Sequence, residues 1–422
     1  MTKKNGILSI IDRYLGYILV VPALILIALF SLYPIIQSLS FSLFDYQVND
    51  QQKNGMFFNR RLNVRYLNEK IEHIDLYYTN FVIPELDEVE DEELILRIEA
   101  FIDQMNEKHE ALLDRIGRDD IVKVSNRDLE EIEEYFVFLQ RETASLNEGI
   151  DVPFANMWVE AIDTIVETLN DTQISNNFVG FENFKRLFKD KRLWNATKNT
   201  LIFTVVSVFF ELILGLFLAM IMNQAMRGRG IVRTMSLIPW AIPTSVAALM
   251  WRYLYDGDAG FIAHLLAQIK VIDNSAVIIT RSIPSMIAVI FADIWKTTPY
   301  MALMLLAGLQ TIPQELYESS SIDGANRFQQ FTRITLPLLK PSILVALLFR
   351  TLDAFRVHDL IQVLTNGGPG NATESLSIYS YKIMRSQMNY GYGAAIVLFM
   401  AVMVGLIAFF YIKVLGVKVR ED

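Results

Sequence analysis

Charged side chains interrupt two strongly apolar segments in the C-terminal half of the chain. The segment at about 284–309 contains Asp293 and Lys296. The segment at about 338–364 contains a denser set of ionisable residues, namely Arg350, Asp353, Arg356, His358 and Asp359. A charge inside a membrane-spanning segment is costly and usually faces a cavity or a partner group. These positions are therefore the first candidates for contact with a solute.

The same charges also allow a purely structural interpretation. Along the second segment, four of them recur every three residues with alternating sign, so each can pair with the next along a helix: Arg350, Asp353, Arg356 and Asp359. Paired charges need no ligand, and both interpretations remain open. Glu211, the lone charge in an earlier apolar segment, is equally suited to a hydrogen bond with a neighbouring helix.

Several other chemistries lack the residues that they require. The chain has no cysteine, which excludes disulfides and thiolate metal sites, and its four histidines are scattered. It contains neither the GxxxxGK[ST] loop that cradles phosphates in an ATPase nor a nucleophile elbow. Clustered basic residues of the kind that bind nucleic acid are also absent from the sequence. We expect no catalytic residue, metal or cofactor in this chain.

Six apolar segments are long enough to cross a membrane as helices. They lie at about 17–43, 198–222, 232–254, 284–309, 338–364 and 393–415. Lysine and arginine gather in alternate connections, at Lys3, Lys4 and Arg13, at Arg227, Arg229 and Arg233, at Arg327, Arg333 and Lys340, and at Lys413, Lys418 and Arg420. Basic loops stay in the cytoplasm, so we predict an all-α polytopic membrane protein with both termini cytoplasmic.

The long connection between the first two segments has a different composition. Residues 45–192 contain 33 acidic against 17 basic side chains, whereas the whole chain has a net charge of −9. Apolar residues recur near helical spacing from Leu94 to Leu113 and again from Leu129 to Leu139, after a start signal at 126–128. We predict an acidic helical domain at 46–176, outside the cytoplasm, whose acidity is a solvated face or a docking surface.

The loop between the fourth and fifth segments, 310–337, is unusually apolar for a cytoplasmic connection. Pro313 suits the first turn of a helix, and Glu315 and Glu318 follow near its positive end. Gly324 allows a sharp turn after that helix, and a second helix should stop before Pro337. Such a helix–turn–helix needs a partner groove, and its contact side chains would include Tyr317, Ile322, Phe328 and Phe331.

The loop resembles the EAA loop of ATP-binding-cassette importer permeases. Glu318, Gly324, Ile334 and the Leu-Pro pair that ends at Pro337 fall at the family spacing, with Ser319-Ser320 where alanines are usual. The resemblance assigns contact with an ATPase to one set of residues: Glu315, Glu318, Ser319, Ser320, Asp323, Gly324, Ala325, Phe328, Ile334 and Pro337.

Other segments are similar to the sugar-importer branch of this family and to its MalF-type subunits. They include Phe178–Asn183, the turn at 227–230, the prolines near Trp240 and the glycine-rich run at 363–371. The resemblance covers about 10–48 and 178–416 and implies the type I importer fold. The expected organisation is a tail and first span at 1–45, the insert at 46–176 and a permease core at 177–422.

The resemblance also implies partners and an energy source. They are a second, MalG-type permease subunit, two ATPase subunits that bind ATP and magnesium, an external solute-binding protein and the lipids of the bacterial inner membrane. Alternating access would move a sugar or oligosaccharide through the charged spans. The alternatives are another solute, such as a polyol or glycerol phosphate, or a membrane receptor or scaffold with an external domain.

A sugar site needs planar polar groups for vicinal hydroxyls and an aromatic face for the ring. The fourth and fifth spans offer both, in Asp293, Trp295, Lys296, Tyr300, Asp353, Arg356 and Asp359. Among these, we expect Asp353 and Arg356 to be the principal contacts. The other tryptophans, including Trp240 and Trp251, are interpreted as interface anchors or packing residues.

Overall fold

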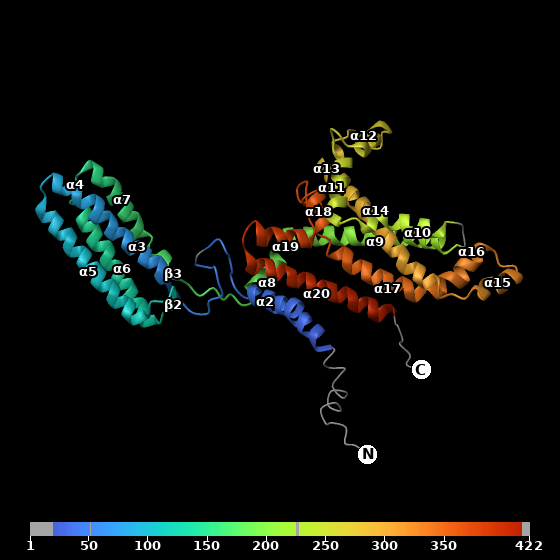
Figure 1. The fold of residues 1–422 in the computed structure, drawn as a ribbon, viewed down its shortest axis with the longest axis horizontal. Coiled ribbons are helices and arrows are strands. Elements are labelled where there is room, and N and C mark those ends of the chain that lie inside the picture. The colour runs from blue at the N-terminus through green and yellow to red at the C-terminus, as the bar shows by residue number, and fades with distance from the viewer. Residues whose placement is uncertain (1–19, 51, 225–227, 416–422) are drawn as a thin grey trace, which may run out of the picture. The chain divides into compact units, whose positions relative to one another are not determined.

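The computed structural model of the protein describes residues 20–50, 52–224 and 228–415 (Figure 1). The chain is mostly helical and divides into two compact units. One contains the chain up to Leu39, Phe184–Gln387 and the chain from Gly393, and the other contains Ser40–Asn183 and Met388–Tyr392. Helices dominate both units, as the sequence predicts, and each unit has its own apolar core.

The second unit holds the acidic insert, in which long helices lie side by side (Figure 1). Its helices are α3 (Val64–Tyr77), α4 (Ile83–Glu88), α5 (Glu92–Ile116), α6 (Asn126–Asn147) and α7 (Pro153–Glu167), with short turns η2 (Tyr78–Val82) and η3 (Leu169–Thr172). Their inward faces form one core, in which Leu62, Ile98, Ile132 and Ile162 are fully buried. Burial of these apolar side chains is the main source of the insert's stability.

The two helices expected from apolar spacing in the insert are confirmed as α5 and α6. Helix α6 begins with a capping box, in which the Ser125 hydroxyl accepts from the Asp128 N–H and the Asp128 carboxylate accepts from the Ser125 N–H. The sequence analysis missed a small antiparallel sheet of order β2-β1-β3, with strands Ile121–Lys123, Arg61–Asn63 and Gln173–Ile174. Strands of two or three residues are too short to leave a visible alternation.

The first unit contains the apolar helices. Five are long and apolar enough to span a membrane: Val20–Ser42, which includes η1 (Ala28–Leu32) and α2 (Tyr33–Ser42), α9 (Lys191–Asn223), α14 (Ser282–Leu309), Arg327–Phe355 and α20 (Tyr390–Leu415). Shorter helices complete the unit: α8 (Glu182–Lys189), α12 (Phe261–Gln268), α13 (Val277–Thr280), α18 (Asp359–Leu364) and α19 (Leu376–Arg385). Helix α14 packs along α9, and the helix Arg327–Phe355 packs against both.

The third apolar segment is not the single helix that we expected. It is a pair, α10 (Arg229–Ala241) and α11 (Thr244–Leu254), bent by 86° at the break. Pro243 explains the break, because the residue before a proline is driven out of the helical region of backbone angles. Ile242 accordingly has φ −70° and ψ 133°. If the bent pair counts as one crossing, the described residues hold six spans.

The expected limits of the fifth span, 338–364, and the expected stop before Pro337 are also wrong. One helix runs from Arg327 to Phe355 through α16 (Arg327–Gln330), the π-helical turn η4 (Phe331–Thr335) and α17 (Leu336–Phe355). The wider turn admits Pro337, which has no N–H to donate and whose ring crowds the preceding carbonyls. The helix ends in a tight turn, where the Arg356 N–H bonds the Asp353 carbonyl.

Candidate functional site

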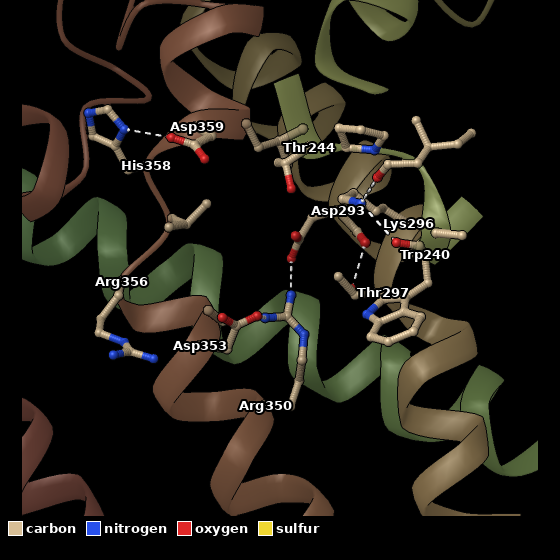
Figure 2. Close-up of a pocket in the computed structure, with 16 residues that line it drawn as sticks. Trp240, Thr244, Asp293, Lys296, Thr297, Arg350, Asp353, Arg356, His358 and Asp359 are labelled. Atoms are coloured by element: carbon tan, nitrogen blue, oxygen red, sulfur yellow. Dashed lines mark hydrogen bonds and ion pairs between the residues drawn. The ribbon is translucent and has the colours of Figure 1, made fainter. Parts of the chain in front are cut away.

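A cavity of about 490 Å³ opens where the break in the third span faces α14 and the end of α17 (Figure 2). Its walls come from the break itself, one turn of α14, and the segment that joins α17 to α18. The polar and aromatic lining residues are Trp240, Thr244, Asp293, Lys296, Thr297, Arg350, Asp353, Arg356, His358 and Asp359. Five of the seven residues predicted for a solute site therefore line one cavity, and Trp295 and Tyr300 do not.

A buried guanidinium lies at the wall of this cavity. Arg350 contacts Glu211 on α9 through two hydrogen bonds of 2.5 and 2.9 Å, and it also bonds Asp293 on α14. A third carboxylate, that of Asp353, lies 3.1 Å away on the cavity side. The Arg350 and Glu211 side chains are 2% and 0% exposed, so this is a buried ion-pair cluster joining three apolar helices. Thr297 adds a 2.8 Å hydrogen bond to Glu211.

The predicted alternating ladder along the fifth span is wrong beyond its first pair. Arg350 and Asp353 do pair, but the helix ends at Phe355, so the later charges leave the helical register. Arg356 is exposed and donates through Nε to the Leu352 carbonyl. Asp359 instead contacts the ring of His358, with 3.1 Å between Oδ1 and Nδ1.

Lys296 has a structural partner that the sequence analysis did not foresee. Its Nζ donates to the Ile242 carbonyl at 2.6 Å and approaches the Trp240 carbonyl at 3.4 Å. These carbonyls lie at the C-terminal end of α10, where a helix leaves carbonyls without internal partners and carries partial negative charge. Lys296 therefore donates hydrogen bonds to the backbone carbonyls at the helix break, which forms one wall of the cavity.

The aromatic face of the cavity is Trp240, which sequence reasoning treated only as an anchor. Tyr300 stacks behind it, with ring centroids 5.6 Å apart and planes 16° from parallel. Trp295 lies elsewhere and contacts Trp251 edge to face at 5.5 Å within an apolar cluster. The proline at 243 was the one sequence signal for this assignment, because the break that it causes brings Trp240 to the wall.

His358 stands at the polar rim of the cavity. His358 Nε2 is buried and has no hydrogen-bond partner among the residues that the structure describes. The ring contacts Tyr381 edge to face, with centroids 5.0 Å apart, which fixes its orientation. The carboxylates of Asp353 and Asp359 give this rim groups that can accept hydrogen bonds from hydroxyls.

The loop at 310–337, which we predicted to lie in the cytoplasm, folds as two helical arms. Helix α15 (Gln314–Ile322) has Asp323 as its C-terminal cap, Gly324 turns the chain with φ +79°, and Asn326 caps the next helix with a capping box. The amide of Gln330 bonds back to the Tyr317 carbonyl at 3.2 Å and to Ser320 Oγ at 3.1 Å, and a further bond joins the Tyr317 hydroxyl to Thr335. The predicted turn at Asp323-Gly324 is thus confirmed.

The outer face of this loop is open. Phe328 is 74% exposed and Ile322 is 88% exposed, whereas Tyr317 and Phe331, also expected at the surface, are half-buried between the arms. A hollow of about 330 Å³ lies beside the turn and is lined partly by predicted ATPase contacts, namely Ser320, Asp323, Gly324, Ala325 and Ile334. Glu315, Glu318, Ser319 and Pro337 are exposed outside it.

Comparison with known proteins places this geometry in a family. Residues 211–421, half of the chain, match the family model described as the binding-protein-dependent transport system inner membrane component. The chain belongs to this family. It is a permease, a membrane-embedded transport subunit rather than an enzyme, and the family works with a binding protein and a separate ATPase.

Individual relatives support the same family assignment. The permease is 45% identical over 237 residues to the trehalose/maltose transport system permease protein MalF of Thermococcus litoralis, covering 56% of this chain and 79% of the relative. It is 42% identical over 260 residues to the trehalose transport system permease protein SugA of Mycobacterium tuberculosis, covering 62% and 81%. A bacterial alginate ABC transporter, solved with an alginate pentasaccharide-bound periplasmic protein, matches with TM-score 0.51 and 28% identity over 56% of this chain and 82% of that one.

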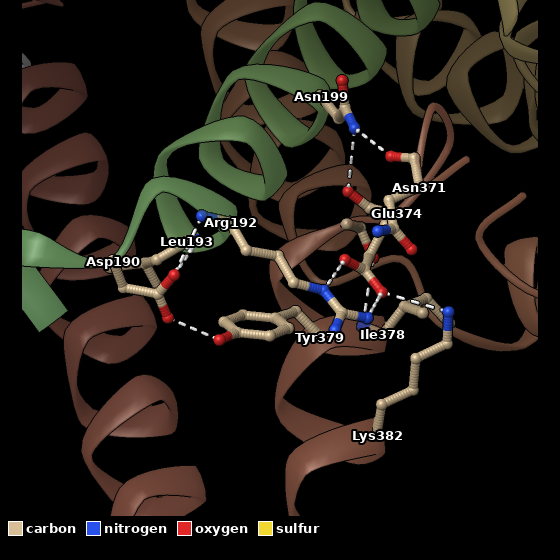
Figure 3. A network of polar contacts seen from close by, with 10 residues as sticks. Asp190, Arg192, Leu193, Asn199, Asn371, Glu374, Ile378, Tyr379 and Lys382 are labelled. Carbon is tan, nitrogen blue, oxygen red and sulfur yellow. Dashed lines mark hydrogen bonds and ion pairs between the residues drawn. The ribbon is translucent and has the colours of Figure 1, made fainter.

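In the permease, the glycine-rich run after α18 is anchored by another buried carboxylate, that of Glu374 (Figure 3). Glu374 is 1% exposed and accepts two 2.8 Å bonds from Arg192 on α9 and one 3.0 Å bond from Lys382 on α19. Asn199 donates to the carbonyls of Asn371 and Glu374. The loop is therefore held on one side through the Glu374 carboxylate and on the other through the backbone carbonyls of Asn371 and Glu374.

The Arg350 cluster predicts a stability difference between two arginines of one segment. Arg350→Gln leaves Glu211 and Asp293 buried without their counter-charge, a change that typically costs about 3–5 kcal/mol. Arg356→Gln removes an exposed side chain with one backbone bond and should cost under about 0.5 kcal/mol. Thermal denaturation of the purified protein in detergent measures both. Equal losses in the two variants would show that the cluster does not hold the spans together.

Proposed function

We propose that this permease forms the path by which an ATP-driven importer moves a sugar or oligosaccharide into the cytoplasm. The observation that carries the proposal is the cavity, which combines carboxylates, the Arg356 guanidinium and Trp240 at a break in a span. Those groups suit a polyhydroxylated ring. The likeness to permeases named for trehalose and maltose supports the same solute class.

The complete importer contains more than this chain. We propose a second, MalG-type permease subunit, two ATPase subunits that bind ATP and magnesium, and an external binding protein that delivers the solute. The chain lies in the cell membrane, contacts its lipids, and has both termini and the 310–337 loop in the cytoplasm. The insert at 46–176 lies on the opposite side, as the distribution of basic residues among the loops favours.

The coupling loop supports a mechanical role. Its second arm is continuous with α17, because one helix runs from Arg327 to Phe355. A displacement of the loop by an ATPase would therefore reach Asp353, at the cavity, through a single rigid element. Arg350 on the same helix contacts α9 and α14, so the displacement would change how three spans pack around the solute. This is the physical basis that we propose for alternating access.

Two other functions are less favoured. A polyol or glycerol phosphate importer would share the architecture, but the relatives named above are sugar permeases. A receptor or scaffold would make the insert its main feature. Membership of a transport family, matched over 211–421, disfavours that alternative.

Substitutions in the cavity should alter transport without loosening the complex. Asp353→Asn and Arg356→Gln each remove a charge-assisted hydrogen bond, and a loss of about 1.4–3 kcal/mol raises KM roughly tenfold or more. The measurement is ATP-driven uptake of radiolabelled trehalose and maltose into proteoliposomes that contain the full complex and its binding protein. Asp151→Asn, on the exposed surface of the insert, is the matched control. Unaltered kinetics in both cavity variants would leave these residues structural.

Substitutions in the coupling loop should abolish uptake while the protein still inserts in the membrane. Proline cannot adopt the φ of +79° at Gly324, and Glu318→Lys reverses an exposed charge on the first arm. ATPase co-purification should fall with uptake in Gly324→Pro and in Glu318→Lys. Glu133→Lys makes the same charge reversal on the insert and should change neither. Wild-type uptake by either loop variant would refute the docking role.

A further inference from the structure

The two arms of the coupling loop, 310–337, meet at a turn that does not itself fix the angle between them. Gly324 has φ +79°, and a side-chain carbon at this position would meet no atom within 4 Å, so nothing packs on that side of the turn. Neither α15 nor α16, both described in full, has a buried residue. The arms therefore lack the buried apolar core that holds other helices of this unit together, and hydrogen bonds take its place.

Gln330, on the second arm, directs its side-chain amide at the first arm. Its Nε2 lies 3.2 Å from the Tyr317 carbonyl, 3.1 Å from Ser320 Oγ and 2.8 Å from Ser321 Oγ. Both hydroxyls donate their own protons to the Tyr317 carbonyl, at 2.9 and 2.7 Å, which leaves their lone pairs to accept from the amide. Three acceptors of α15 thus surround two N–H donors, and alanine at either serine would remove one acceptor.

Tyr317 makes a second contact with the other arm, beyond the π-helical turn η4. Its hydroxyl lies 3.0 Å from Oγ1 of Thr335, a residue that is 6% exposed. Gln330 precedes η4 and Thr335 ends it, so Tyr317 is bonded to both ends of this turn, through its carbonyl and its hydroxyl. The turn leads directly into α17, and π-helical turns are frequent at functional sites. The first arm is therefore tied to the helix that reaches the cavity.

We propose that Gln330 is a positioning residue that transmits movement of the first arm to α17, with Ser320 and Ser321 as its acceptors. The inference rests on the proposed function, in which an ATPase displaces this loop. The exposed side chains of Ile322 and Phe328 remain available for docking when the Gln330 contacts are lost. The ATPase then stays attached and hydrolyses ATP, while the first arm, held by fewer contacts, delivers less of its movement to α17.

Gln330 also lines the hollow beside the turn, so direct contact with the ATPase is the competing explanation. Gln330→Met separates the two, because it keeps the length of the side chain and removes both N–H donors. In the full complex, ATPase co-purification should stay at the level of the unaltered protein. In proteoliposomes with the binding protein, the trehalose or maltose taken up per ATP hydrolysed should fall about threefold or more, since one hydrogen bond is worth a factor of about two to ten.

Two further variants sharpen this measurement. Ser320→Ala combined with Ser321→Ala should lower the same ratio, and adding Gln330→Met should lower it no further, because all three changes remove one set of contacts. Gln329→Met is the matched control. The Gln329 amide oxygen accepts from the Asn326 N–H within the second arm, so this variant should leave the ratio unchanged.

Hydrogen exchange reads the same contacts without transport. In the full chain in lipid nanodiscs, the amides of α15 should exchange about threefold or more faster in Gln330→Met and at an unchanged rate in Gln329→Met. Unchanged exchange in Gln330→Met would overturn the inference, as would an unaltered uptake per ATP. Loss of the ATPase from Gln330→Met would overturn it too, because Gln330 would then be a docking residue. Absence of uptake by the unaltered complex would instead contradict the proposed function, and exchange would still decide whether Gln330 holds the arm.

Discussion

One guanidinium constrains the architecture of the membrane unit. Arg350 on α17 contacts carboxylates from α9 and α14 in a buried cluster, so three spans share a single charged centre. Burying these charges is costly, and the cost is offset only while every partner stays in place. The cavity lies directly against this cluster, because Asp293, Arg350 and Asp353 also line it. A movement that separates the spans must therefore rearrange the same groups that line the cavity.

The break in the third span supplies the other wall, and it follows the same physical rule. Backbone carbonyls inside a membrane must find internal donors, or the break would be too costly. Lys296 meets that need from α14, and Trp240, at the same break, lines the cavity. Both walls thus use a cation of the permease to satisfy protein groups, and the exposed carboxylates of Asp353 and Asp359 remain as hydrogen-bond acceptors in the lining.

The features that depend on local chemistry could be predicted from the sequence. Gly324 stands at a position with positive φ, and the apolar periodicity of α5 and α6 identified the insert helices. The features that depend on packing could not be predicted from the sequence. Nothing in the spacing shows that Glu211 and Arg350, 139 residues apart, share a buried contact, or that Trp240 rather than Trp295 faces the cavity. The regular spacing of charges near Asp353 suggested that the helix continues beyond Phe355, where it in fact ends, since repetition says nothing about where a helix ends.

We propose that this chain is one subunit of a larger transporter, in which the cavity provides the path and a loop continuous with α17 receives the force. The most direct test is affinity purification of the tagged full chain from its native cell in mild detergent. The account predicts that a second permease and an ATPase elute with it, and that an added sugar-loaded binding protein stimulates ATP hydrolysis by the complex. Elution of the folded chain without an ATPase, under conditions that preserve a known importer complex, would contradict it.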